Sequence, residues 1–451
     1  MTATYEFPAA LALDVAAGIG YGIARRALWF DERCTWFDGT PVMPGNSPKS
    51  ITLGADVYAG TSGVGLVLAQ IAARTGDAIL RDTALGAIRQ TLAALDAPLT
   101  DLGFYGGKAG VAAALVLAGR ELGDDEPLER GRALLREIPL AGDDPDQNDI
   151  IAGTAGTIVA LIAASAVLGD DTLLERAREA AGVLIRLAHR NDDGTLSWST
   201  MPDKLADLCG FGHGASGNAF AMLALHARVP DTALRDAIDG ALAYERARFS
   251  PQHGNWPDYR WFGTGPREPS YPVSWCHGAV GIVRARLLAE SLGFDVGDEI
   301  DVALDTAEQQ AWRQLSDPNG DATLCHGLFG TLDALLDGAR SGRTQYATVV
   351  ARCAGTTAER HHFADVPWPS GLITHEPIDG LMMGNAGVAH VHLRLADPTV
   401  RPVLAPIESV VHRSCTSSSS ALQLSPQRIT PDTVDHQPQK CRDGNDEQDE
   451  R

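Results

Sequence analysis

The sequence lacks an excess of basic residues, and it contains few aromatic ones. Lys and Arg together number 37 against 58 Asp and Glu, which gives a formal net charge of −21. Because phosphate binding needs a basic face, this composition argues against a nucleic-acid partner. Aromatic residues make up only 6 %, whereas the chain holds 47 glycines and many Ala-rich runs. The composition therefore favours closely packed helices over β-sheets.

The sequence also lacks the marks of secretion and of membrane insertion. Its seven cysteines are an odd number, and they are spread without the density of a disulfide framework. No Lys or Arg precedes Arg25, and Asp14 interrupts the first apolar stretch, so no signal peptide is evident. Residues 150–169 are uncharged but rich in Gly, Ala, Ser and Thr, which predicts a buried helix and no membrane span. We therefore expect a cytoplasmic protein.

A repeat is the strongest signal that is present. Seven times a Gly-x-x-Gly sequence opens a mostly apolar, helix-like run, at intervals of 46 to 64 residues. The pairs are Gly60/Gly63, Gly107/Gly110, Gly153/Gly156, Gly214/Gly217, Gly278/Gly281, Gly327/Gly330 and Gly384/Gly387. A helix that is apolar on every side must be buried on every side. Each interval has room for two helices, so the repeat predicts seven helical hairpins.

A second class of helix lies between these apolar runs. The ranges 80–95, 173–190, 233–249 and 299–315 place apolar residues at helical spacing on one face and charged residues on the other. Alternation of buried and amphipathic helices predicts an all-α fold, a double-layered α/α toroid of seven hairpins. We expect the stretch 9–29 to form the outer helix of the first hairpin. The toroid is predicted to span residues 1–406, and the polar residues 407–451 are predicted to be a disordered tail.

Two Cys-His-Gly triplets stand at equivalent positions of the fifth and sixth repeats. Cys276, Cys325 and His326 are good zinc ligands, and the repeat places them near one mouth of the ring. Three protein ligands predict an open site of the kind that catalytic zinc uses, whereas His277 or Cys209 as a fourth ligand would make the site structural. Two thiolates reduce the Lewis acidity of the ion, so activation of a substrate thiol is favoured over activation of water.

Two further residues open inner helices and are expected at the same mouth. His213 precedes the first glycine of the fourth pair, and Asp149 lies four residues before that of the third. Imidazoles titrate near neutral pH, so His213 could protonate a carbanion or enolate. Asp149 could orient that histidine or handle a second proton. Each residue could instead serve only a helix terminus.

Taken in this order, the motifs of residues 8–406 resemble the lanthionine synthetase C-like cyclases. The matching motifs are Asp149-Ile-Ile-Ala-Gly-Thr-Ala-Gly, Gly-His213-Gly-Ala-Ser-Gly, Ser-Trp-Cys276-His-Gly, Leu-Cys325-His326-Gly and Gly380-Leu-Met-Met-Gly-Asn-Ala-Gly. The resemblance implies zinc at Cys276, Cys325 and His326, with one ion per chain. It also implies that His213 is the acid and that Asp149 is needed for activity. His277 departs from the Tyr of many stand-alone bacterial members.

The resemblance also implies the reaction. Family members add a peptide cysteine thiol to dehydroalanine or dehydrobutyrine, which forms a lanthionine or methyllanthionine thioether ring in a precursor peptide. Since little precedes the repeats, dehydration of that peptide is expected from a separate protein. Two alternatives stay open: addition of glutathione or another small thiol to dehydroamino acids, and a non-catalytic zinc-stabilised scaffold that binds peptides. A carbohydrate-active toroid would need paired carboxylates at the mouth, and Asp149 has no evident partner of that kind.

Overall fold

The computed structural model describes residues 7–37, 52–95, 101–140, 147–201, 204–261, 267–317, 320–370 and 377–407. All but the first residue of the predicted tail, 407–451, lies outside these ranges, so its predicted disorder and the domain boundary stay predictions. The described residues of the ring form fourteen α-helices, one π-helical turn and two short β-hairpins.

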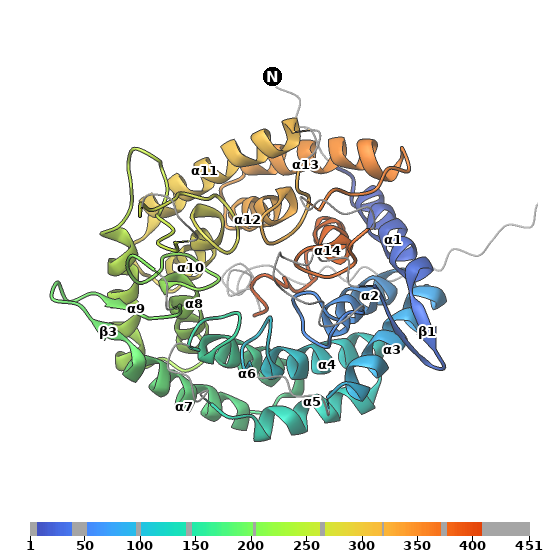
Figure 1. Ribbon diagram of the computed structural model, residues 1–451, viewed down its shortest axis with the longest axis horizontal. Coiled ribbons are helices and arrows are strands. Elements are labelled where there is room, and N and C mark those ends of the chain that lie inside the picture. The colour runs from blue at the N-terminus through green and yellow to red at the C-terminus, as the bar shows by residue number, and fades with distance from the viewer. Residues whose placement is uncertain are drawn as a thin grey trace, which may run out of the picture. The chain divides into compact units, whose positions relative to one another are not determined.

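The helices form two concentric layers, as Figure 1 shows in a view down the ring. The inner layer consists of α2 (Thr61–Thr75), α4 (Lys108–Leu122), α6 (Thr154–Leu168), α8 (Ala215–His226), α10 (Ala279–Ser291), α12 (Leu328–Arg340) and α14 (Asn385–Ala396). The outer layer consists of α1 (Ala9–Arg26), α3 (Ala78–Ala93), α5 (Asp125–Glu137), α7 (Thr172–Leu187), α9 (Thr232–Arg246), α11 (Gly297–Ser316) and α13 (Tyr346–Thr357). This arrangement confirms the predicted double-layered α/α toroid, in which seven inner helices pair with seven outer ones among the described residues.

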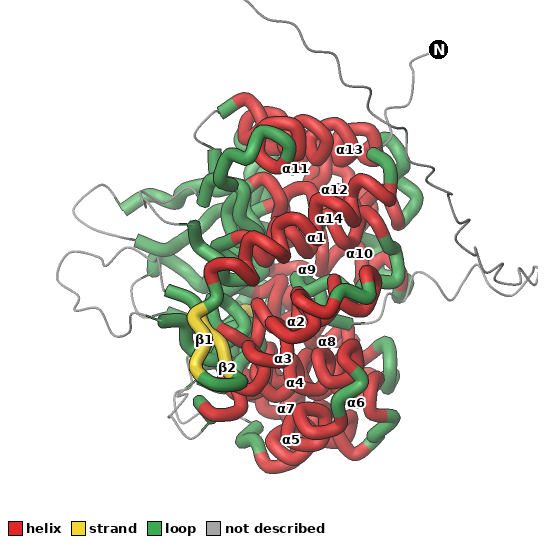
Figure 2. Tube along the Cα trace, turned by 90° about the vertical axis from the view of Figure 1, so that its right-hand side faces the viewer, coloured by secondary structure: helices red, strands yellow, loops and turns green. Residues whose placement is uncertain are grey.

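The remaining elements are small and lie in the connections. Strands β1 (Leu28–Phe30) and β2 (Arg33–Thr35) pair antiparallel, as do β3 (His189–Arg190) and β4 (Leu196–Ser197). The π-helical turn η1 (Ala358–His362) continues α13. Figure 2 shows the ring from its edge, with loops at both ends of the helical layers.

Helix α1 corrects one expectation from the sequence. It belongs to the outer layer, as predicted, but it is not the outer member of the first hairpin. Its most extensive contacts are with the last inner helix, α14, and α3 covers α2 instead. The bond from Arg26 to Asp379, with Nε 2.9 Å from Oδ2, joins the same two ends of the chain. The N-terminal helix therefore closes the ring against the C-terminal repeat.

The two glycines of each pair have different structural roles. The first glycine of each pair is the N-cap of an inner helix, as at Gly60 and Gly107. At the second glycine, a β-carbon would collide with the backbone carbonyl oxygen six residues earlier, and this holds in all seven repeats. Gly110, for example, lies against the carbonyl oxygen of Phe104. The Gly-x-x-Gly pattern thus records a turn that folds tightly back onto its own helix.

Backbone hydrogen bonds join the loops that precede the inner helices into a ring. Each bond uses residues that lie two or three positions before the first glycine of a pair. These bonds of 2.8–3.2 Å run from amide to carbonyl, from Met382 to Tyr58, from Tyr58 to Tyr105, from Tyr105 to Ile151, from Gly212 to Cys276, from Trp275 to Cys325 and from Cys325 to Met382. The third and fourth repeats are joined at this level by a side-chain bond between Asp149 and His213. All seven loops therefore meet at one mouth.

Residues 397–407 fold back into the interior of the ring. Val403 and Leu404 are buried, and the Tyr105 hydroxyl donates to the carbonyl of Val403 at 3.0 Å. Arg401 reaches the carbonyl of Ala163 on α6, on the opposite side of the ring. The uncharged run 150–169 forms the buried helix α6, as predicted. None of the helices in the described ranges has the length and apolar character that crossing a bilayer requires.

Candidate metal centre

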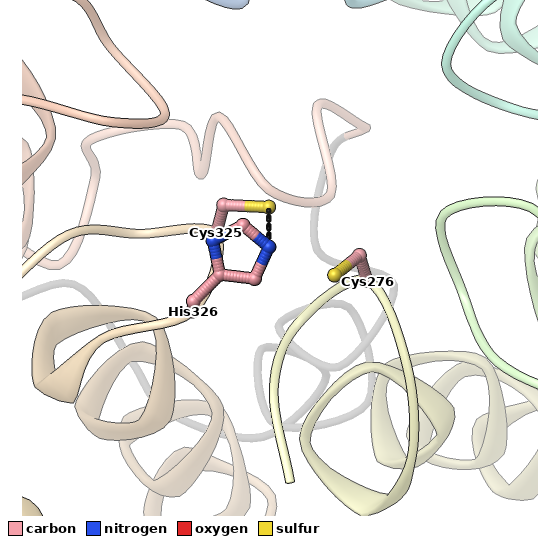
Figure 3. A group of neighbouring side chains, drawn as sticks. All are labelled: Cys276, Cys325 and His326. Atoms are coloured by element: carbon pink, nitrogen blue, oxygen red, sulfur yellow. Dashed lines mark hydrogen bonds between the residues drawn. The ribbon is translucent and has the colours of Figure 1, made fainter. Parts of the chain in front are cut away.

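The structure brings Cys276, Cys325 and His326 together at the mouth. One ligand atom from each residue lies within 4.8 Å of those of the other two, and the Sγ of Cys325 is 3.4 Å from Nε2 of His326. Figure 3 shows the three side chains converging from two neighbouring loops. Both cysteines are buried, whereas His326 is exposed. The cluster is therefore accessible from the mouth on its histidine side.

The local backbone explains why two loops can present their ligands to one point. The amide of Trp275 donates to the carbonyl of Cys325 at 3.0 Å, which holds the two cysteine loops side by side. Gly278, the N-cap of α10, has φ 83°, a conformation that favours glycine. A side chain at Gly278 would also collide with the carbonyl of Pro272. This turn directs Cys276 into the mouth while α10 runs away from it.

The electrostatics of the cluster favour a bound cation. The neighbouring Cys325 thiol, and then the His326 ring, hold the pKa of Cys276 well below its ordinary value. Burial is the largest influence on Cys325, whose pKa is raised. Contact with Cys276 raises the pKa of His326. The low pKa of Cys276 places a negative charge in a buried cluster, which a cation would stabilise. Two thiolates with one imidazole are a ligand set that zinc prefers. The residues fit a zinc ion.

The two alternative fourth ligands do not join this cluster. The His277 ring is buried and faces His213, with ring centroids 5.9 Å apart, and its Nδ1 is 3.8 Å from Oδ1 of Asp258. Burial lowers the pKa of His277 to about 4, so its ring is neutral at neutral pH. Cys209 is buried in the core beside α8, and neither residue belongs to the group of converging ligand atoms. Among the described residues, the cluster therefore has three members.

His213 and Asp149 lie beside the cluster as a hydrogen-bonded pair. Nδ1 of His213 is 2.6 Å from Oδ2 of Asp149, and the two side chains are 19 % and 6 % exposed. The preceding residue, Gly212, donates its amide to the carbonyl of Cys276 at 2.9 Å, which places His213 next to the metal loop. Because a carboxylate oxygen accepts, Nδ1 of His213 is the donor of this bond, and Nε2 takes no part in it.

Asp149 also performs the helix-terminal role that the sequence left open. Its Oδ1 accepts the amide of Ala152 at 2.7 Å, in the turn just before α6. Asp56 occupies the same position in the first repeat and accepts the amide of Ala59 at 2.8 Å. The carboxyl of Asp149 therefore serves two partners, one oxygen for the turn and one for His213.

Comparison with known proteins identifies the family. Residues 52–405 match the model of the lanthionine synthetase C-like proteins, which is most of the chain. The chain belongs to this family. No protein in a search of curated sequences matches it.

Solved structures are similar to this chain as well. Nisin cyclase matches with a TM-score of 0.63 and 17 % identity, covering 88 % of this chain and 96 % of its own. The family 76 α-mannanase of Bacteroides thetaiotaomicron matches with a TM-score of 0.48 and 11 % identity, covering 85 % and 95 %. At these identities the likeness to nisin cyclase establishes the α/α toroid.

Sequence reasoning missed one residue at the centre of this lanthionine synthetase C-like chain. The hydroxyl of Tyr58, from the first repeat, lies 2.9 Å from Sγ of Cys325. Burial raises the pKa of this phenol, which therefore stays protonated. A signal was available, because Tyr58 stands two residues before Gly60, just as Cys325 stands two residues before Gly327.

Proposed function

We propose that the protein is a zinc-dependent cyclase that adds cysteine thiols of a precursor peptide to dehydroalanine or dehydrobutyrine, which forms lanthionine or methyllanthionine rings. One observation carries this proposal: a Cys276–Cys325–His326 cluster lies beside a His213–Asp149 pair at the mouth of the ring. The first group suits a thiophilic cation and the second suits proton transfer. Membership of the lanthionine synthetase C-like family supports the same reaction.

The cluster would hold the ion, and the thiol of the substrate would meet it there. Cys276, Cys325 and His326 are the proposed ligands. Bound zinc lowers the pKa of a substrate thiol, so that a thiolate is available near neutral pH. The exposed side of His326 leaves the cluster open toward the mouth, where a peptide can enter.

His213 is the proposed acid of the second half of the reaction. The substrate sulfur forms a bond to the β-carbon of the dehydroamino acid, and the electron pair of the C=C bond moves to form an enolate. Nε2 of His213 takes up the proton that the substrate thiol releases, and the α-carbon of the enolate then takes this proton from Nε2. Asp149 holds the opposite ring nitrogen at 2.6 Å, which orients the ring and stabilises its protonated form.

The substrate partner is a dehydrated precursor peptide, and the dehydration is assigned to a separate enzyme. The cytoplasm is the proposed location. The five cysteines of the described residues are all free thiols, which supports a reducing compartment. The acidic surface implied by a net charge of −21 suits a basic peptide segment.

The test uses zinc-loaded protein and a dehydrated peptide that contains one cysteine. Ring closure leaves the peptide mass unchanged but removes the thiol, so a maleimide added afterwards no longer labels the product. We expect the loss of labelling without any added thiol. Glutathione is offered in a second reaction with a dehydrated peptide that lacks cysteine. A glutathione adduct there, with full maleimide labelling in the first reaction, would replace the peptide cyclase by a small-thiol transferase. Reaction in neither assay would leave the scaffold alternative.

A further inference from the structure

Tyr58 occupies the position in the first repeat that the metal cysteines occupy in the fifth and sixth. It lies two residues before Gly60, as Cys276 lies two residues before Gly278. In the ring of backbone bonds, the amide of Met382 donates to the carbonyl of Tyr58 at 2.8 Å, and the amide of Cys325 donates to that of Met382 at 3.0 Å. Only the seventh repeat therefore separates Tyr58 from Cys325.

The side chain of Tyr58 crosses this gap and ends at the metal cluster. Its hydroxyl is 2.9 Å from Sγ of Cys325 and 3.6 Å from Sδ of Met383. A sulfur is a hydrogen-bond acceptor when it is a thiolate, and the phenol is the donor. The sulfur of Cys276 has a different neighbour, because its Sγ is 3.4 Å from the hydroxyl of Ser274. The two sulfurs of the cluster are therefore not equivalent.

We infer that Tyr58 is a positioning residue that donates a hydrogen bond to the Cys325 thiolate when the cluster binds zinc. This inference rests on the proposed zinc site. The bond withdraws charge from one sulfur and fixes the direction in which it faces the ion. Partners of this kind orient metal ligands and tune the ion, and their loss commonly costs about 10- to 100-fold in metal affinity.

Tyr105 offers a matched control from the second repeat. It stands at the same repeat position, and its hydroxyl donates to the backbone carbonyl of Val403 at 3.0 Å. Tyr105→Phe therefore removes a buried tyrosine hydroxyl that bonds to the chain and not to a sulfur. Met383→Leu is a second comparison, because it removes the neighbouring thioether and keeps the phenol of Tyr58.

The experiment loads the wild type, Tyr58→Phe, Tyr105→Phe and Met383→Leu with Co²⁺ and records the thiolate-to-cobalt charge-transfer band. Zinc affinity is measured on the same proteins by competition with a chelator. We expect the band of Tyr58→Phe to move to longer wavelength, because a sulfur without the hydrogen bond is richer in electrons. We expect its zinc affinity to fall about tenfold or more. Tyr105→Phe and Met383→Leu should keep the wild-type band and affinity.

The outcomes separate this inference from the proposed function. A wild type without a thiolate-to-cobalt band would overturn the zinc site and the inference with it. A normal wild-type band that Tyr58→Phe leaves in place would overturn the inference alone. An equal shift in Met383→Leu would also overturn it, since that result assigns the change to packing around the cluster. Thermal unfolding of the metal-free proteins checks that Tyr58→Phe folds as Tyr105→Phe does.

Discussion

Nδ1 of His213 lies 2.6 Å from Oδ2 of Asp149, at the boundary between the third and fourth repeats. The contact couples the position of the imidazole ring to that of the carboxylate. Asp149 holds the imidazole through Nδ1, which leaves Nε2 outside this bond. The repeat supplies both positions, because the loops before α6 and α8 are neighbours in the ring.

Asp149→Asn should reduce the rate of ring formation without unfolding the protein. The amide oxygen can still accept from Ala152, but the charge that stabilises protonated His213 is lost. We expect a loss of about 10- to 100-fold, smaller than the loss on removal of a general acid itself. Asp56→Asn is the control, since Asp56 forms the same turn with Ala59. Equal losses in both variants would assign Asp149 to the turn alone.

His213→Gln should abolish most of the activity while the protein still binds zinc. Removal of a general acid lowers the reaction rate about 100- to 10,000-fold, so the variant should bind the peptide but form its ring far more slowly. His189→Gln is a matched control, because Nδ1 of His189 also contacts a carboxylate, Oδ2 of Asp207, at 2.8 Å. Wild-type turnover in His213→Gln, measured by maleimide labelling of the peptide, would remove His213 from the mechanism.

Gly110→Ala tests the structural basis of the repeat. The new β-carbon would collide with the carbonyl of Phe104, so the turn before α4 must shift. We expect a loss of about 1–3 kcal/mol in the free energy of unfolding, as for an overpacked core. Gly182→Ala, on the outer helix α7, meets only the tip of Arg186 and should stabilise the protein by about 0.5–1 kcal/mol. Denaturant melts measure both values, and a stabilised Gly110→Ala would contradict the packing argument.

Much of the fold could be predicted because each repeat needs the same tight turn, one buried helix and one amphipathic helix. The glycines mark a tight turn before every buried helix, and the alternating amphipathic runs mark the outer layer. Closure of the ring could not be predicted in the same way. Helix α1 has an apolar face that suits several neighbours, and its contact with α14 depends on where the last repeat ends in space. The return of residues 397–407 into the ring left no periodic signal either.

In the candidate site, too, some residues could be predicted from the sequence and others could not. Cys276, Cys325 and His326 could be found because cysteine and histidine at equivalent repeat positions are chemically conspicuous. His277 looked equally suitable, yet its ring turns to His213 and Asp258, a choice that depends on side-chain rotamers. Tyr58 was missed because tyrosine is common in cores and its partner lies 267 residues away.

His392 should make the protein sensitive to acid. Its ring is buried among Phe7, Phe329 and Trp368, at centroid distances of 5.7, 5.1 and 5.8 Å, and neither nitrogen has a hydrogen-bond partner among the described residues. Burial lowers its pKa from 6.5 to about 3. Between pH 6.5 and about 3, the unfolded chain therefore binds a proton at His392 that the folded chain does not bind. Stability is full above pH 6.5 and falls as the pH drops toward 3.

Replacement of His392 by an aromatic ring that cannot titrate should flatten this dependence. The linkage predicts that this residue alone costs about 2 kcal/mol of the free energy of unfolding at pH 5 relative to pH 8. In His392→Phe the difference between the two pH values should shrink by that amount. His253→Phe, at an exposed position, should leave the difference unchanged. An unchanged difference in His392→Phe, from urea melts at both pH values, would contradict the burial argument.

Zinc content and the rate of ring formation, measured together on one series of samples, test the zinc-dependent cyclase most directly. The wild type is stripped with a chelator and reloaded in steps, with Cys325→Ala and the buried-thiol control Cys353→Ala beside it. We expect the rate to rise in proportion to bound zinc and to level off at about one ion per chain. Cys353→Ala should behave as the wild type, and Cys325→Ala should lose both metal and activity. A stripped protein that closes rings at the full rate would contradict the proposed function.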